Sequence, residues 1–237
     1  MSDEGTGEGL EAERPPEGTV EALFAADRAK AFFDAVVAIA MTLLILPLLD
    51  AVTSNSQARA GALPWLESHV ELLVSFVLSF GVIAMFWINH HRMYARVHSV
   101  TTVLIWINVA WLATIVWLPV ATALINESTI DNDVTGKVVY IGTMTSTSLI
   151  AFFQDLFLRA HPRLHDIPRQ SLLRGTAASL ATTVLFVVAL ALSILVPDVG
   201  YYWLLVLFLT GPMAMLFGRM LGVRPQSRRR DPGARRT

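Results

Sequence analysis

The sequence contains no cysteine, which excludes disulfides, thiolate metal ligands and cysteine nucleophiles. Charged residues are also scarce: they make up 16% of the 237 residues, whereas about a quarter is usual in a soluble domain. The short patterns typical of zinc proteases, serine hydrolases and P-loop proteins do not occur. We therefore expect no enzyme, no metal site, no cofactor and no nucleic-acid partner. Hydrophobic residues make up 54% of the chain, which instead favours a membrane protein.

The N-terminal segment lacks the basic start and short apolar stretch of a signal peptide. From Ser2 to Pro16 it is rich in Gly, Glu and Pro, a composition that buries too little apolar surface to fold. We predict a disordered acidic tail over 1–26, a transmembrane domain over 27–222 and a basic tail over 223–237.

Long apolar segments fill most of the remaining chain. A helix needs about 20 mainly apolar residues to cross the hydrocarbon core, and six segments qualify: 31–51, 66–88, 101–124, 138–158, 172–195 and 200–221. The fourth is the most polar, and near its end Asp155 is expected to pair with Arg159, one helical turn later. Because lipid offers no partners to backbone polar groups, the predicted fold class is all-α with six transmembrane helices.

Basic residues indicate the orientation of these helices. With the N-terminus inside, 16 of the 18 Lys and Arg residues lie on the cytoplasmic side, and only Arg59 and Lys137 lie outside. We therefore predict that both termini are cytoplasmic. The external loops are acidic, which either concentrates cations at a mouth or keeps the loops soluble.

The first predicted span contains a carboxylate. Asp34 follows Arg28 by six residues, so it lies about 9 Å deeper along a helix. An unpaired carboxylate at that depth is costly. We expect His90 or His91, at the end of the second span, to hold Asp34, and Asn108 of the third span to join this network. Alternatively, the two histidines are solvated at the membrane interface.

The same span carries an apolar stripe. Ile39, Leu43 and Leu46 follow the spacing i, i+4 and i+7 and share a face with Arg28 and Phe32, whereas Asp34 faces elsewhere. Such stripes face lipid on most membrane helices. Several copies of this stripe around one axis would instead form stacked apolar rings, which can close a pore by dewetting. The spacing alone leaves both interpretations open.

The first span also follows a recognisable pattern. It reads Arg28-x-x-x-Phe32-Phe33-Asp34, then Ala and a run of Ile, Ala, Thr and Leu that ends in Pro47. This resembles the first helix of the TMEM175 family of potassium channels, except that Phe33 replaces the family's Ser. Aromatic, His and Asn residues of the next two spans also look similar to that family: Trp87, His90, His91, Trp106, Asn108 and Trp111.

The resemblance implies a fold, an assembly and a function. Prokaryotic members carry one six-helix repeat per chain and form homotetramers whose first helices line a central pore. This chain would then be a potassium-selective channel subunit of a prokaryotic cell membrane, with K⁺ as the permeant ion. The resemblance places the constriction at Ile39, further apolar rings at Leu43 and Leu46, and a hydroxyl at Thr42. It also implies a structural network that comprises Arg28, Phe32, Asp34, His90, His91 and Asn108.

Two other classes of function remain open. A proton-coupled secondary transporter could use Asp34 with His90 or His91 as a proton relay, although the sequence shows no internal repeat of the kind many transporters have. A membrane scaffold would use the same motif only for packing. Potassium flux into liposomes separates these classes, because a channel conducts without a coupling ion.

Overall fold

The computed structural model describes residues 17–54, 61–126, 134–196 and 209–223. Within these ranges every regular element is a helix, and one isolated β-bridge joins Val97 to His165. The all-α prediction is confirmed. The elements in order are α1 (Glu17–Leu43), α2 (Leu46–Ser54), α3 (Ala62–Ser68), α4 (Val70–Tyr94), α5 (Thr102–Asn126), α6 (Val134–Ala160), η2 (Pro162–Leu164), α7 (Arg169–Leu195) and α8 (Thr210–Met220).

Four stretches of the described chain are long and apolar enough to cross a membrane: Ala26–Thr53, Val70–Tyr94, Thr102–Asn126 and Arg169–Leu195. They coincide with the first, second, third and fifth predicted spans, so the protein is a multi-pass helical membrane protein. Helix α6 occupies the fourth predicted span but is more polar. Helix α8 covers the end of the sixth, and residues 200–208 of that span lie outside the described ranges.

The first span is longer than predicted and is interrupted. Helix α1 begins at Glu17, ten residues before the expected start of the membrane domain at 27, because the segment from Glu17 is rich in the helix formers Ala, Glu and Leu. It ends at Leu43, and α2 starts at Leu46. Pro47 explains this break, because it lacks an amide hydrogen and its ring would clash with the carbonyl of Leu43.

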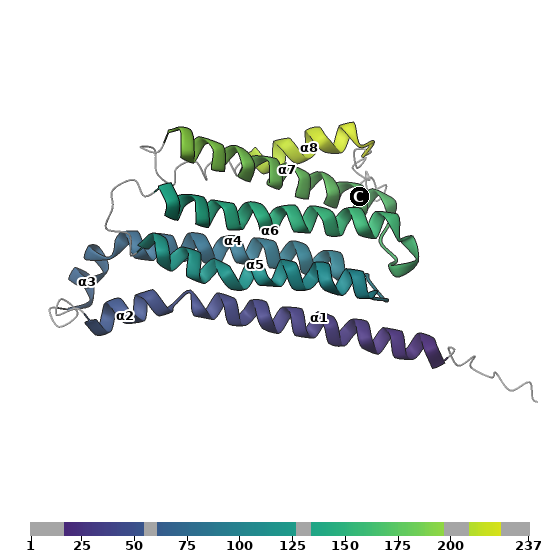
Figure 1. Ribbon diagram of the computed structural model, residues 1–237, viewed down its shortest axis with the longest axis horizontal. Helices are drawn as coiled ribbons and strands as arrows, with labels where there is room; N and C mark the ends of the chain where they lie inside the picture. The colour runs from purple at the N-terminus through teal and green to yellow at the C-terminus, as the bar shows by residue number, and fades with distance from the viewer. Residues whose placement is uncertain (1–16, 55–60, 127–133, 197–208, 224–237) are drawn as a thin grey trace, which may run out of the picture.

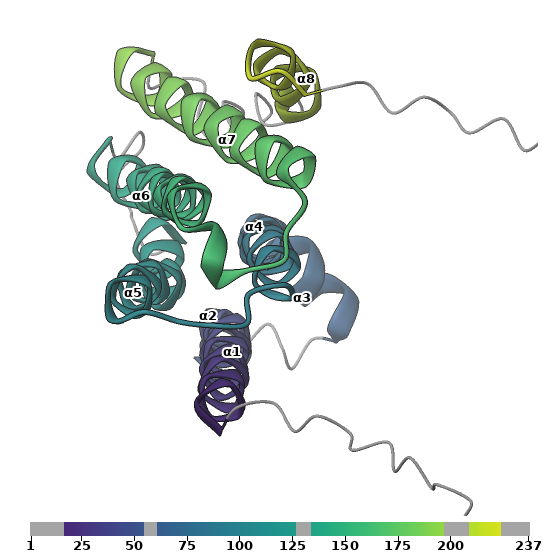
Figure 2. The same ribbon diagram turned by 90° about the vertical axis from the view of Figure 1, so that its right-hand side faces the viewer.

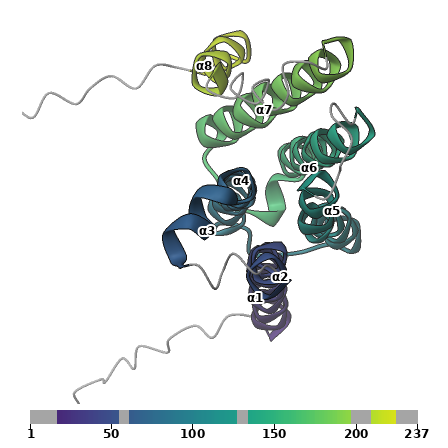
Figure 3. The same cartoon turned by 90° about the vertical axis from the view of Figure 1, so that its left-hand side faces the viewer.

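The helices are stacked in layers (Figure 1). Helix α1 packs on α4 and α5, α6 packs on α5 and α7, and α8 packs on α7. Figure 2 looks along the bundle from one end and Figure 3 from the other; in both views α1 lies at one edge and α8 at the opposite edge. Helix α1 therefore has one face against the bundle and one face that no other described helix covers.

Buried hydroxyl groups join the central helices. The hydroxyl of Thr122 on α5 donates to Ser79 Oγ on α4 at 3.0 Å, and Ser79 Oγ lies 2.9 Å from the hydroxyl of Tyr140 on α6. Hydroxyl groups of α6 between Thr143 and Ser148 donate to carbonyl oxygens of their own helix. These bonds explain how so polar a helix is accommodated among apolar neighbours.

Candidate functional site

The two faces of α1 lie in opposite environments. One face packs into the hydrophobic core, where Phe33 keeps only 4% of its surface exposed. This buried stripe comprises Phe33, Val37 and Ala40 of α1 and Leu44, which directly follows the helix. The other face is uncovered, and Ile39 is 60% exposed. The exposed stripe comprises Phe32, Ile39 and Leu43 of α1 and Leu46, the first residue of α2; the sequence placed all four on one face.

Thr42 lies on the exposed side of α1, next to this stripe. Its hydroxyl donates to the carbonyl oxygen of Ile39 at 2.7 Å. Because the hydrogen is used within the helix, the lone pairs of the oxygen remain available to accept a bond or to coordinate a cation. The exposed side therefore combines apolar side chains with one hydroxyl oxygen.

Two side chains of α4 hold the carboxylate of Asp34. The indole Nε1–H of Trp87 donates to Asp34 Oδ1 at 2.9 Å, and His91 Nδ1 lies 3.3 Å from Oδ2. Trp87 and His91 are four residues apart, so they share one face of α4. We call these three residues the carboxylate anchor. The sequence pattern does not identify Trp87 as a partner of Asp34, although the spacing of Trp87 from His91 is a signal that could have done so.

His90 forms no hydrogen bond or ion pair with Asp34 but points into the bundle, where its Nε2 lies 2.8 Å from Asn108 Oδ1. The imidazole is stacked between the rings of Tyr94 and Trp111, with centroid separations of 4.3 and 4.2 Å. The ring of Phe33 meets His90 edge-on at 5.9 Å. Phe33, which stands where the family that this span resembles has Ser, thus packs against the buried His90.

Asn108 is the centre of this second cluster. Its Nδ2 donates to the carbonyl oxygen of Leu104 at 2.7 Å and to the hydroxyl of Tyr94, and its Oδ1 lies 3.3 Å from Gln154 Nε2. A carbonyl oxygen can only accept, so the Leu104 bond fixes which end of the Asn108 amide is the nitrogen. His90 must then donate through Nε2. We call His90, Tyr94, Asn108 and Gln154 the amide cluster.

The structure thus distributes the predicted network over two clusters. His91 reaches Asp34, His90 reaches Asn108, and no hydrogen bond joins Asp34 to Asn108. Consecutive residues of a helix point about 100° apart, which is why His90 and His91 cannot serve the same partner. Arg28 is exposed and forms no ion pair within the described chain, and Phe32 contacts only the ring of Phe33 among the aromatic side chains.

Asp155 also has a different partner from the one expected. The hydroxyl of Ser179 on α7 donates to Asp155 Oδ2 at 2.6 Å. The predicted close ion pair with Arg159 is not formed, although the guanidinium of Arg159 still interacts electrostatically with the carboxylate. Helices α6 and α7 make the most extensive contact in the bundle. The hydroxyl of Ser179 on α7 is therefore close enough to bind the carboxylate of Asp155.

The segment that contains most of both clusters matches a known family. Residues 28–119 match the family model described as "Endosomal/lysosomal potassium channel TMEM175". This segment includes Asp34, Trp87, His90, His91 and Asn108, whereas Gln154 lies beyond it.

Bacterial relatives and one solved structure agree with this match. A potassium channel of Streptomyces collinus is 28% identical over 130 residues, which cover 55% of this chain and 62% of the relative. A potassium channel of a Chryseobacterium species is 22% identical over 182 residues, which cover 76% of this chain and 90% of the relative. The crystal structure of a lysosomal potassium-selective channel TMEM175 homolog from Chamaesiphon minutus aligns with a TM-score of 0.61 and 24% identity, covering 84% of this chain and 98% of the other. The last match shows a shared fold.

Proposed function

This chain belongs to the TMEM175 family, and on that basis we propose that it is a subunit of a potassium-conducting channel whose pore is lined by α1. The observation that carries the proposal is the exposed stripe of α1. It is opposed by a buried stripe and by the carboxylate anchor, which together fix the rotation of the helix. Ile39, Leu43 and Leu46 are thereby held away from their own subunit.

A pore of this kind requires more than one copy of the chain. Helix α1 lies at the edge of the bundle, so a single subunit encloses no axis (Figure 2). In a homotetramer, four copies of the exposed stripe would face each other and form rings at Ile39, Leu43 and Leu46. Stacked apolar rings of this type restrict hydrated ions and can gate by dewetting.

The proposed topology follows the sequence. Six spans with both termini in the cytoplasm place 16 of the 18 basic residues inside. The domain runs over 27–222, between an acidic and a basic tail, in the cell membrane of a prokaryote. In this orientation the carboxylate anchor and the amide cluster lie toward the cytoplasmic end of the bundle, and the Ile39 ring lies further along the pore.

The same geometry suggests how K⁺ is preferred over Na⁺. A narrow apolar ring at Ile39 forces an ion to shed part of its water, and this loss costs less for the larger ion. The oxygen of Thr42, on the same exposed side, would partly replace that water. No cofactor is required.

The test is the ion selectivity of the Ile39→Asn variant in liposomes. We expect this polar ring to reduce the preference for K⁺ over Na⁺. The matched control is Ile105→Asn, because Ile105 is an exposed isoleucine on α5, outside the proposed pore. Unchanged selectivity in the Ile39 variant would remove Ile39 from the constriction. An equal change of selectivity in the Ile105 variant would show that the effect does not depend on the position of Ile39 in the exposed stripe.

A proton-coupled transporter is the second candidate, and one observation favours it. Asp34 and His91 form a carboxylate–imidazole pair in which both side chains are partly exposed, and such a pair can exchange a proton with water. The two functions differ in the driving force that ion movement requires. A channel passes K⁺ along a voltage without a proton gradient, whereas a transporter requires that gradient.

A further inference from the structure

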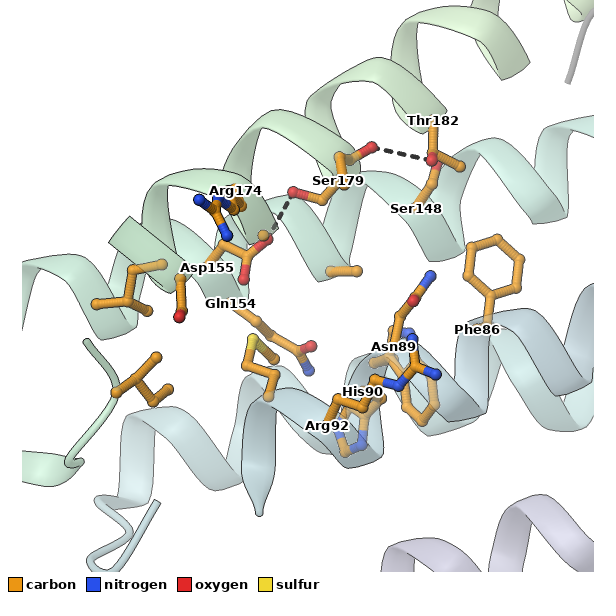
Figure 4. A pocket seen from close by; sticks show the side chains of 18 residues that line it. Phe86, Asn89, His90, Arg92, Ser148, Gln154, Asp155, Arg174, Ser179 and Thr182 are labelled. Atoms are coloured by element: carbon orange, nitrogen blue, oxygen red, sulfur yellow. Dashed lines mark hydrogen bonds between the residues drawn. The ribbon is translucent and has the colours of Figure 1, made fainter. Parts of the chain in front are cut away.

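A cavity of about 420 Å³ lies among α4, α6 and α7, on the side of the amide cluster away from α1 (Figure 4). This α4–α7 cavity is separate from the exposed stripe, and neither the proposed pore nor the carboxylate anchor uses it. Its size falls within the range of small-molecule pockets, roughly 300–1,000 Å³. Its polar lining includes Asn89, Arg92, Gln154, Asp155, Arg174 and Ser179.

The inner wall of the cavity presents hydrogen-bond acceptors. The buried Oε1 of Gln154 has no hydrogen-bond partner among the described residues, because the amide nitrogen is turned toward Asn108. Asp155 is 6% exposed, and its carboxylate lies beside Gln154 in the chain. Figure 4 shows both side chains reaching toward the cavity from α6. A buried acceptor without a donor is costly, so this wall favours a ligand that carries hydroxyl or ammonium donors.

The rim of the cavity is basic. Arg92 on α4 and Arg174 on α7 line opposite walls, and both are exposed. Guanidinium groups match the geometry of phosphate oxygens and bind them through paired hydrogen bonds. The amide of Asn89 and the hydroxyl of Ser171 add donors on the same two walls. An anionic group therefore fits at the rim, and a donor group fits further in.

Apolar side chains complete the lining, among them Phe86, Met93, Ile167 and Leu172. A free phosphate ester would leave these side chains unused, whereas a lipid would place its glycerol and upper acyl carbons against them. The cavity also lies between helices of a membrane protein, at the end of α4 and the start of α7. Basic pockets in such positions are typical sites for anionic lipid headgroups.

We propose that the α4–α7 cavity binds the headgroup of an anionic phospholipid such as phosphatidylglycerol. The phosphate lies between Arg92 and Arg174, and the terminal hydroxyls donate toward Asp155 and Gln154 Oε1. A choline headgroup has no such donors and binds more weakly. This site serves a different ligand from the permeant ion, and it does not require that the protein conduct potassium.

The test is a lipid titration of the purified full-length protein in neutral detergent, followed by native mass spectrometry. The probes are phosphatidylglycerol, phosphatidylcholine and soluble glycerol 3-phosphate. We expect phosphatidylglycerol to bind more tightly than phosphatidylcholine by about tenfold, as expected for charge-assisted hydrogen bonds. The double substitution R92Q/R174Q should remove this preference. The matched control R96Q/R163Q also removes two exposed arginines near this end of the bundle, but neither lines the cavity, so it should retain the preference.

A second variant tests the volume of the cavity without altering charge. Ala178→Phe fills part of the space from α7 and should also lower binding of phosphatidylglycerol; thermal unfolding of the same variant in the same detergent reports whether the protein still folds. Equal binding of the two lipids by the wild type would overturn the proposal, as would equal loss in the test and control double variants. Displacement of phosphatidylglycerol by an equal concentration of soluble glycerol 3-phosphate would overturn the assignment to a lipid.

Discussion

The two faces of α1 are made of similar residues and have opposite surroundings. Phe33 and Phe32 are neighbours in the chain, yet Phe33 is buried against α4 and Phe32 is 58% exposed. The buried stripe packs its apolar surface against other helices of the same chain. The exposed stripe has no partner within the described chain, so its surface is available for lipid, for other copies of α1 or for the wall of a pore. Hydrophobic character therefore does not distinguish the two faces of α1, whereas the location of the carboxylate anchor does.

The largest expected effect contrasts the two phenylalanines. Phe33→Ala removes a ring that contacts His90 and Tyr94, and such core truncations cost about 3–5 kcal/mol of unfolding free energy. Phe32→Ala should change that free energy by less than about 0.5 kcal/mol. Unfolding of both variants in mixed detergent micelles measures the difference. Equal losses would show that the two faces of α1 are not distinct in the assembled protein.

The two histidines give the next largest contrast. His90→Ala leaves the buried oxygen of Asn108 without its best donor and empties the space between two aromatic rings, so we expect a loss of about 2–3 kcal/mol. The side chain of His91 is 54% exposed, and exposed ion pairs contribute about 0–1 kcal/mol. His91→Ala should therefore lower stability much less. The same unfolding measurement applies to both variants. A larger loss for His91→Ala than for His90→Ala would contradict this prediction.

A smaller effect tests the carboxylate anchor. Trp87→Phe keeps an aromatic ring but removes the indole N–H that donates to Asp34, and one such bond to a charged group contributes about 1.5–3 kcal/mol at most. Because Asp34 is partly exposed, we expect a loss of about 1 kcal/mol. Trp106→Phe is the control, because Trp106 is an exposed tryptophan on α5. A loss of the same size in the control would show that the indole bond to Asp34 contributes nothing specific.

Helical periodicity predicted the faces of α1, and the sequence offered His90 or His91 as the partner of Asp34. His91 is that partner, but the sequence did not choose between the two histidines and did not identify Trp87. The spacing of Ile39, Leu43 and Leu46 is enough to place them on one face, and the cost of a buried charge is enough to show that Asp34 needs a partner. Which side chain supplies it depends on the rotation of α4 about its axis. That rotation is set by packing of Phe86 and Ile83 in the core, and the sequence pattern gave no measure of it.

Contacts between residues that are far apart in the chain could also not be predicted from the sequence pattern. Gln154 follows Asn108 by 46 residues, and nothing in the spacing of α5 and α6 predicts that their amides meet. Asp155 was expected to pair within its own helix, but Ser179 lies closer because α6 and α7 pack side by side. Local sequence features are more informative about where helices end. Pro47 lies in the predicted first span, and the chemistry of proline alone explains why α1 ends at Leu43.

The central claim is that the exposed stripe of α1 faces water along a shared axis. Because the natural sequence has no cysteine, single cysteines can be placed at 39, 43 and 46 and compared with cysteines at 37 and 40, on the buried stripe. In membranes, we predict that a water-soluble thiol reagent modifies the first group and blocks potassium flux, and leaves the second group unmodified. If the cysteines at 39, 43 and 46 remain unmodified and flux continues, the stripe faces lipid and the account is contradicted.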